Sequence, residues 1–117
     1  MIYKEFQDLK LSALGFGAMR LPVKDNDPNA AIDEAAAAKM VDEAIKNGIN
    51  YFDTAYGYHN GQSEIVMGKI LSNYPRESYY LATKFPGYDL SNICLLYTSW
   101  GWRSCLSGAN AKNKCIW

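Results

Sequence analysis

The chain has 117 residues, and its formal net charge is zero because 12 Lys or Arg balance 12 Asp or Glu. Hydrophobic residues make up 49% of it, which is typical of one soluble globular domain and excludes a disordered or collagen-like chain. The neutral charge argues against nucleic acid or an anionic membrane as a partner, and no apolar run approaches the ~20 residues of a membrane span. The N-terminal residues do not form a signal peptide, so we expect a cytoplasmic protein.

Composition changes sharply near residue 94. Residues 1–93 contain 9 basic and all 12 acidic residues, whereas residues 94–117 contain 3 basic residues, all 3 cysteines and all 3 tryptophans. The tail is too short to bury a core of its own, and its cysteine spacing indicates no metal site. The codons of residues 94–99 can be written as a string that resembles the transposase end sequence of sequencing adapters. We therefore predict that 1–93 is one native unit and that 94–117 is a non-native tail from adapter or frameshift translation, with a natural tail as the alternative.

The first part of the chain predicts a hairpin, a strand and a loop. Two short apolar-bearing pieces surround Gln7 and Asp8 within residues 2–12, which favours a hairpin. Residues 14–19 predict a short buried strand, and residues 20–32, which contain two prolines, predict a loop.

The most regular pattern predicts a helix that begins at Asp33, whose carboxylate can cap the first turn. Its apolar residues follow helical spacing, at Ala37, Met40, Val41, Ala44 and Ile45. Asp42 and Lys46 form an i, i+4 pair, and Gly48 supplies the left-handed residue that ends the helix.

A second helix lies between two further strands. Residues 49–54 and 78–85 predict strands, and residues 55–62 predict a loop. The helix has Ser63 as its N-cap and ends before Pro75. Its apolar stripe is expected to contain Met67, Ile70, Leu71 and Tyr74. The order strand, helix, strand, helix, strand predicts a parallel α/β sheet, and the pattern leaves open whether that sheet is doubly wound or part of a (β/α)8 barrel.

Three residues of complementary chemistry follow the predicted parallel strands. Asp53 ends the second strand, Lys84 ends the third, and Tyr58 lies in the loop after Asp53. Ligands of parallel α/β proteins bind at the carboxyl ends of strands, where neighbouring backbones are ~4.8 Å apart. A cation lowers the pKa of a nearby tyrosine, ordinarily near ~10, so the trio suits proton donation to a carbonyl oxygen. The alternative is a surface ion pair beside a packing tyrosine.

Four motifs carry a resemblance to a known family. Residues 53–58 read Asp-Thr-Ala-x-x-Tyr, residues 81–84 read Leu-Ala-Thr-Lys, residues 14–22 contain Gly-Phe-Gly-Ala-Met-Arg, and residues 58–64 end in Ser-Glu. In this order and spacing they resemble the aldo/keto reductase superfamily over about residues 2–92. Taken alone, the two glycines of residues 15–17 would suggest a dinucleotide-binding turn, but the third glycine and an immediate helix are missing.

This resemblance implies a (β/α)8 barrel closed at its bottom by an N-terminal hairpin, of which the chain supplies that hairpin, the first three strands and two helices. It implies hydride transfer between NADPH, or in some members NADH, and a small aldehyde or ketone. Tyr58 is then the general acid, Lys84 lowers its pKa, and Asp53 holds Lys84. The cofactor-binding residues implied by the same resemblance are Gly17, Ala18, Met19, Arg20 and Asp53.

The resemblance also shows what this sequence lacks. The family's catalytic histidine follows Lys84, where this chain has none, so His59 is expected to be a loop, pocket or surface residue. The N-terminus resembles a bacterial branch that can carry a C-terminal iron–sulfur domain, but the chain has no cysteine set for such a cluster. We expect the chain itself to be inactive, to bind no cofactor tightly, and to self-associate through an unpaired third strand. The alternative is a non-catalytic truncated barrel or a regulatory or binding relative.

Overall fold

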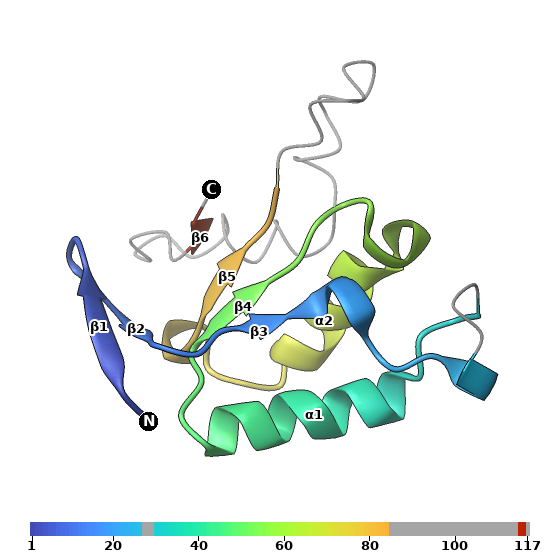
Figure 1. Ribbon diagram of the computed structural model, residues 1–117, viewed down its shortest axis with the longest axis horizontal. Coiled ribbons are helices and arrows are strands. Elements are labelled where there is room, and N and C mark those ends of the chain that lie inside the picture. Colours follow the sequence, from blue (N-terminus) through green and yellow to red (C-terminus); the bar gives the residue numbers. More distant parts are fainter. Residues whose placement is uncertain (27–29, 85–114, 117) are drawn as a thin grey trace.

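The computed structural model describes residues 1–26, 30–84 and 115–116 (Figure 1). The chain begins with an antiparallel hairpin of β1 (Tyr3–Phe6) and β2 (Leu9–Ser12). Gln7 in the connecting turn has a φ of 55°, as the tight turns that suit twisted hairpins require. The predicted hairpin is therefore confirmed.

Asn50 attaches this hairpin to the rest of the fold. Its side-chain oxygen accepts a hydrogen bond from the Ser12 amide at 2.7 Å, and its side-chain nitrogen donates to the Lys10 carbonyl at 3.0 Å. The Tyr3 hydroxyl donates to the Gly48 carbonyl at 3.0 Å. The hairpin is thus held at the amino ends of the parallel strands, away from the end where a ligand would bind.

The central sheet has the strand order β3 (Phe16–Gly17), β4 (Tyr51–Asp53), β5 (Tyr80–Ala82) and β6 (Cys115–Ile116), and every neighbouring pair is parallel (Figure 1). The parallel α/β class is therefore confirmed. The first strand is shorter than the predicted 14–19, because Ala18–Arg20 forms a 3-10 turn, η1. Leu14 and Met19 are also 60% and 59% exposed, so the expectation that this whole segment is buried was wrong.

The edge of β5 differs from expectation. Leu81 and Ala82 pair with Cys115 and Ile116, so the third strand is not an unpaired edge at these positions. The backbone N–H and C=O groups of an edge strand favour any segment that can pair with them, which is the physical reason for the difference. Self-association of the chain stays a prediction, as does the non-native origin of residues 94–117, most of which lie outside the described residues.

The first helix, α1 (Glu34–Lys46), follows the sequence closely. Asp33 caps it, with its carboxylate accepting a hydrogen bond from the Ala36 amide at 3.0 Å, and Gly48 has the predicted left-handed φ of 87°. The Asp42–Lys46 pair forms at 2.6 Å. Met40 is 46% exposed, so its place in the buried stripe was wrong: the buried face is centred on Ala37, Val41 and Ala44.

The second helix, α2 (Gln62–Leu71), ends before Pro75 as predicted, but its N-cap and the place of Tyr74 differ from the prediction. Gly61, with a φ of 86°, precedes its first residue, and Ser63 is not the N-cap. The Ser63 hydroxyl is committed elsewhere, since it donates to the Ala18 carbonyl. The helix stops at Leu71, before Pro75, and Tyr74 lies beyond it.

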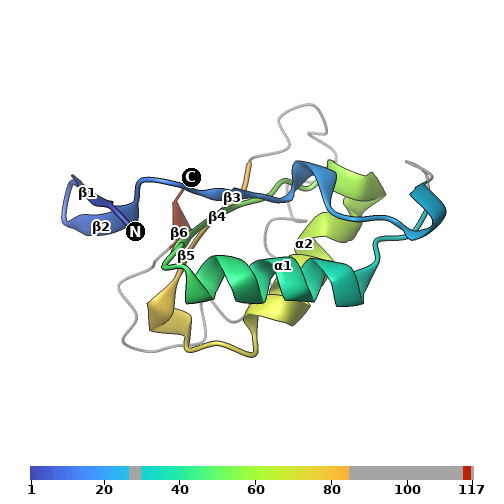
Figure 2. The same cartoon turned by 60° about the horizontal axis from the view of Figure 1, so that its bottom comes forward.

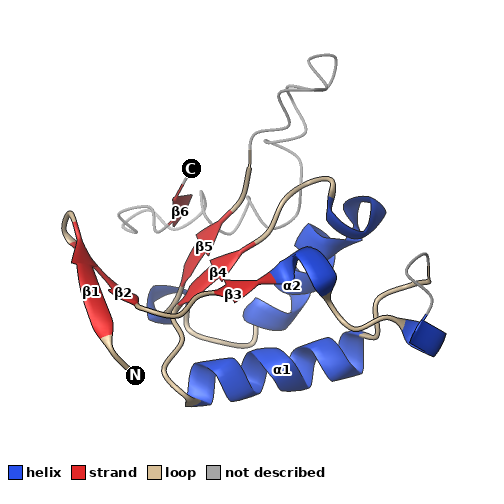
Figure 3. Cartoon of the chain, in the orientation of Figure 1, coloured by secondary structure: helices blue, strands red, loops and turns tan. Residues whose placement is uncertain are grey.

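Both helices pack on one face of the sheet, as Figures 2 and 3 show. Phe16, Phe52 and Leu81 are register partners across β3, β4 and β5, and they pack against the core that the helices form. Phe52 is fully buried, and its ring lies 5.6 Å from that of Phe16. No helix among the described residues is both long enough and apolar enough to cross a membrane.

Candidate active site

The carboxyl ends of β3, β4 and β5 form one edge of the sheet, which we call the strand mouth. Gly17, Asp53 and Ala82 are register partners there, and Lys84 follows Ala82 by two residues. Nζ of Lys84 lies 2.6 Å from Oδ1 of Asp53 and donates to the Thr54 carbonyl at 3.1 Å. The predicted meeting of Asp53 and Lys84 is therefore confirmed.

Tyr58 joins this pair from a 3-10 turn, η3 (Tyr58–Gly61). Nζ of Lys84 lies 5.0 Å from the centroid of the Tyr58 ring. Burial lowers the pKa of Lys84, but the interactions with Asp53 and Tyr58 raise it more, and the net pKa is above its ordinary value. Lys84 is therefore a cation over the whole neutral range, placed against both a carboxylate and a phenol.

Three side-chain hydrogen bonds join α2 to the strand mouth, and the sequence did not reveal them. Ser63 donates to the Ala18 carbonyl at 3.0 Å, so the 3.0 Å contact between the Thr54 and Ser63 hydroxyls must use the Thr54 proton. Thr83 donates to the Glu64 carboxylate. Thr54 and Ser63 are 2% and 0% exposed. The only available signal was the presence of small polar residues in apolar elements, because buried hydroxyls need partners.

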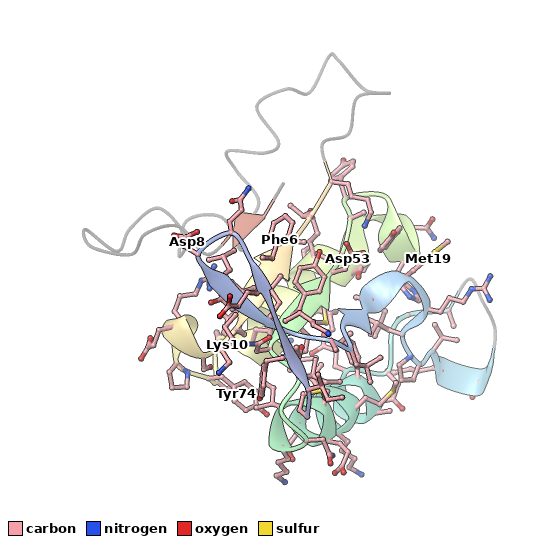
Figure 4. All side chains as sticks on the ribbon, turned by 60° about the vertical axis from the view of Figure 1, so that its left-hand side comes forward. Phe6, Asp8, Lys10, Met19, Asp53 and Tyr74 are labelled. Carbon is pink, nitrogen blue, oxygen red and sulfur yellow. The ribbon has the colours of Figure 1, made fainter. Side chains whose placement is uncertain are left out.

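The residues predicted to bind a cofactor differ in what they present. A Cβ built on Gly17 would meet nothing within 4 Å, so the space beside Asp53 is open. Ala18 is fully buried and uses its carbonyl to accept from Ser63. Met19 and Arg20 are exposed. Figure 4 shows Met19 and Asp53 toward one end of the molecule and Tyr74 toward the other.

His59 has a specific partner. Its Nε2 accepts a hydrogen bond from the Leu21 amide at 2.9 Å, which joins the turn after β4 to the turn after β3. His59 is half-buried and lies next to Tyr58 in sequence. It was expected to be a loop, pocket or surface residue, and the structure places it in the loop as a link between two turns.

The fold and this cluster define a class of protein: a parallel α/β protein whose strand mouth places a carboxylate, an ammonium and a phenol in contact. Such a cluster can hold and move a proton at the phenol oxygen. Among residues 1–26, 30–84 and 115–116, no cluster of histidine, cysteine and acidic side chains suits a metal ion.

Comparison with known proteins gives the family. The profile of the aldo/keto reductase family matches residues 13–115, so the chain belongs to that family. It is 39% identical over 79 residues to Probable aldo-keto reductase 1 of Glycine max, covering 68% of this chain and 22% of that protein. It is 35% identical over 80 residues to the NADH-specific methylglyoxal reductase of Escherichia coli strain K12, covering 66% of this chain and 23% of that protein.

Solved structures of aldo-keto reductases also match this chain. The aldo-keto reductase AKR11C1 of Bacillus halodurans, in its holo form, is 41% identical with a TM-score of 0.55, and the match covers 67% of this chain and 23% of that one. The chain thus spans about a quarter of the length of the relatives that it matches. The neighbours are (β/α)8 barrels, and the described part of the present chain contains the hairpin, three consecutive parallel strands and two helices of that fold, without a closed barrel.

Proposed function

We propose that the protein to which this chain belongs reduces a small aldehyde or ketone to an alcohol with NADPH, or alternatively NADH. Membership of the aldo/keto reductase family supports this reaction class. The observation that carries the proposal is the position of Nζ of Lys84, 2.6 Å from Asp53 and 5.0 Å from the Tyr58 ring centroid. A lone surface ion pair would not need the tyrosine.

In this proposal Tyr58 gives its proton to the carbonyl oxygen of the substrate. Lys84 remains charged and stabilises the phenolate that is left, which makes the proton transfer easier. Asp53 and the Thr54 carbonyl hold the ammonium in place. A bound reduced nicotinamide supplies the hydride that the carbonyl carbon receives.

The open space at Gly17 suits a flat ring, because no side chain lies where a Cβ would project. Met19 offers an exposed apolar side chain in the adjoining turn. We propose that Gly17 and Met19 contact the nicotinamide and that Ala18 contributes through the backbone turn that Ser63 holds. The relative from Escherichia coli is named for NADH, so this proposal allows either nicotinamide.

We further propose that the polypeptide of residues 1–117 alone has no turnover. A full (β/α)8 barrel needs ~250 residues, and its ligand site is built from loops of all eight strands.

Resequencing the source DNA across codon 94 from a library prepared without a transposase tests the origin of residues 94–117. A reading frame that continues into a fourth strand with a histidine would support the non-native origin of residues 94–117. Unchanged codons would refute that origin.

The test of the reaction is Tyr58→Phe in the complete gene product. We expect kcat for a generic aldehyde to fall by about 10²–10⁴-fold, the usual contribution of a positioned proton donor. Tyr56→Phe removes a hydroxyl from the same loop and serves as the matched control, with kcat unchanged. An unchanged kcat for Tyr58→Phe would refute the proposed donor, and turnover by residues 1–117 alone would refute the inactivity of the fragment.

A further inference from the structure

His59 is a polar residue near the strand mouth that the proposed reaction does not use. Its Nε2 lies 2.9 Å from the amide nitrogen of Leu21, a residue 38 positions earlier in the chain. Leu21 is 4% exposed and belongs to the hydrophobic core, so its backbone position is fixed by packing. The hydrogen bond therefore joins the turn that carries Tyr58 to the backbone of a core residue.

The turn that carries Tyr58 needs such a tie. His59 and Asn60 have φ values of 51° and 54°, so two consecutive non-glycine residues lie in the left-handed region. That region costs free energy for residues with a Cβ, even though His and Asn tolerate it better than most. A strained turn keeps its shape only when the surrounding structure holds it, and the bond to Leu21 is one such contact.

A second hydrogen bond holds the other end of the 3-10 turn Ala18–Arg20, which precedes Leu21. Ser63, in the first turn of α2, donates to the Ala18 carbonyl at 3.0 Å. The bonds to Ala18 and Leu21 therefore enclose Met19 and Arg20 between them. The turn after β3 is consequently held at one end by α2 and at the other by the turn that carries Tyr58.

We propose that His59 is a positioning residue that sets the location of the Tyr58 phenol relative to the turn Ala18–Arg20. This inference rests on the proposed function, in which Tyr58 supplies the proton and that turn lies beside the nicotinamide. Its role is geometric: Nε2 accepts a hydrogen bond, so the ring is neutral and carries its proton on Nδ1. His59 therefore does not replace the histidine that the family places on a later strand.

The hydrogen bond can be tested without any activity. In residues 1–117 labelled with 15N, long-range ring correlations at neutral pH should report the Nδ1–H tautomer with an unprotonated Nε2. The Leu21 amide should exchange about three- to tenfold faster in His59→Leu, as expected for the net loss of one hydrogen bond. His59→Gln, which keeps an acceptor at nearly the same reach, should restore slow exchange. An Nε2–H tautomer in the wild type would overturn the inference even if the variants did not fold.

The positioning role is tested in the complete gene product. His59→Leu should lower kcat by about tenfold or more, because small displacements of a reacting group cost up to about 10²-fold, and KM for the aldehyde should change less. His59→Gln should recover most of the loss. Failure of Gln to recover kcat, while it restores slow Leu21 exchange, would overturn the positioning role. Retained activity of Tyr58→Phe would refute the proposed function separately, since the tautomer and exchange results do not depend on it.

Discussion

Lys84 and Asp53 are 31 residues apart in the chain, yet Nζ of one lies 2.6 Å from Oδ1 of the other. Adjacent parallel strands bring them together, because β4 and β5 end side by side with Asp53 opposite Ala82. The contact raises the pKa of Lys84 in spite of the opposing effect of burial. The parallel topology thus places a group that is cationic at neutral pH where Tyr58 lies.

Lys84→Met in the complete gene product should lower kcat by about 10²-fold or more, because the phenolate of Tyr58 loses its neighbouring cation. Lys46→Met is the matched control, since Lys46 also pairs with a carboxylate at 2.6 Å but lies on the exposed side of α1. Steady-state kinetics with one aldehyde checks both variants. Full activity in Lys84→Met would remove the lysine from the mechanism.

Ser63→Ala should lower the free energy of unfolding of residues 1–117 by about 1–3 kcal/mol, the cost of leaving buried polar groups without partners. The Ala18 carbonyl and the Thr54 hydroxyl both lose a hydrogen bond in this variant. Ser72→Ala is the control, because the Ser72 hydroxyl also donates to a carbonyl but is exposed. Urea titration measures both. Equal losses in the two variants would show that the buried contacts do not exist as described.

Substitution by alanine should affect stability differently at Gly15, just before β3, and at Gly17, within β3. A Cβ at Gly15 would lie 2.8 Å from the Tyr51 ring, so Gly15→Ala should cost about 1–3 kcal/mol of stability through overpacking. A Cβ at Gly17 would meet nothing within 4 Å, so Gly17→Ala should leave the urea midpoint nearly unchanged. In the complete gene product, Gly17→Ala should instead raise Kd for the nicotinamide cofactor. A large stability loss at Gly17 would contradict the open space at this position.

Stability should fall in alkaline solution. Burial raises the pKa of Tyr79 above 10.0, with Arg76 opposing it, and the pKa of Lys84 lies above 10.5. A pKa that is higher in the folded state contributes stability fully below the unfolded value and loses it as pH rises through the folded value. The urea midpoint should therefore decrease above about pH 10. Tyr79→Phe should reduce this decrease, and an identical pH profile in the variant would exclude Tyr79 as a cause.

Local patterns account for the elements that the sequence predicted well. The hairpin, the Asp33 cap and the Gly48 terminus depend on a few neighbouring residues, and the structure confirms all three. The predicted N-cap of α2 was wrong because two acceptable roles compete for the Ser63 hydroxyl. It donates to the distant Ala18 carbonyl and does not cap the helix, which Gly61 precedes instead. The predicted burial of Met40 was wrong for a different reason. The periodicity defines an apolar stripe along the helix, but tertiary packing decides which side of that stripe is covered.

The sequence by itself determined the order of the elements, the parallel sheet that this order requires, and the polar residues at the ends of its strands. Hydrophobic periods and turn residues act over a few positions, so they can be read without the fold. The tertiary structure decided which groups meet: Thr54 with Ser63, Thr83 with Glu64, and His59 with Leu21. These contacts join residues distant in the chain, and their geometry depends on how α2 and two turns pack against the sheet, which no local pattern specifies.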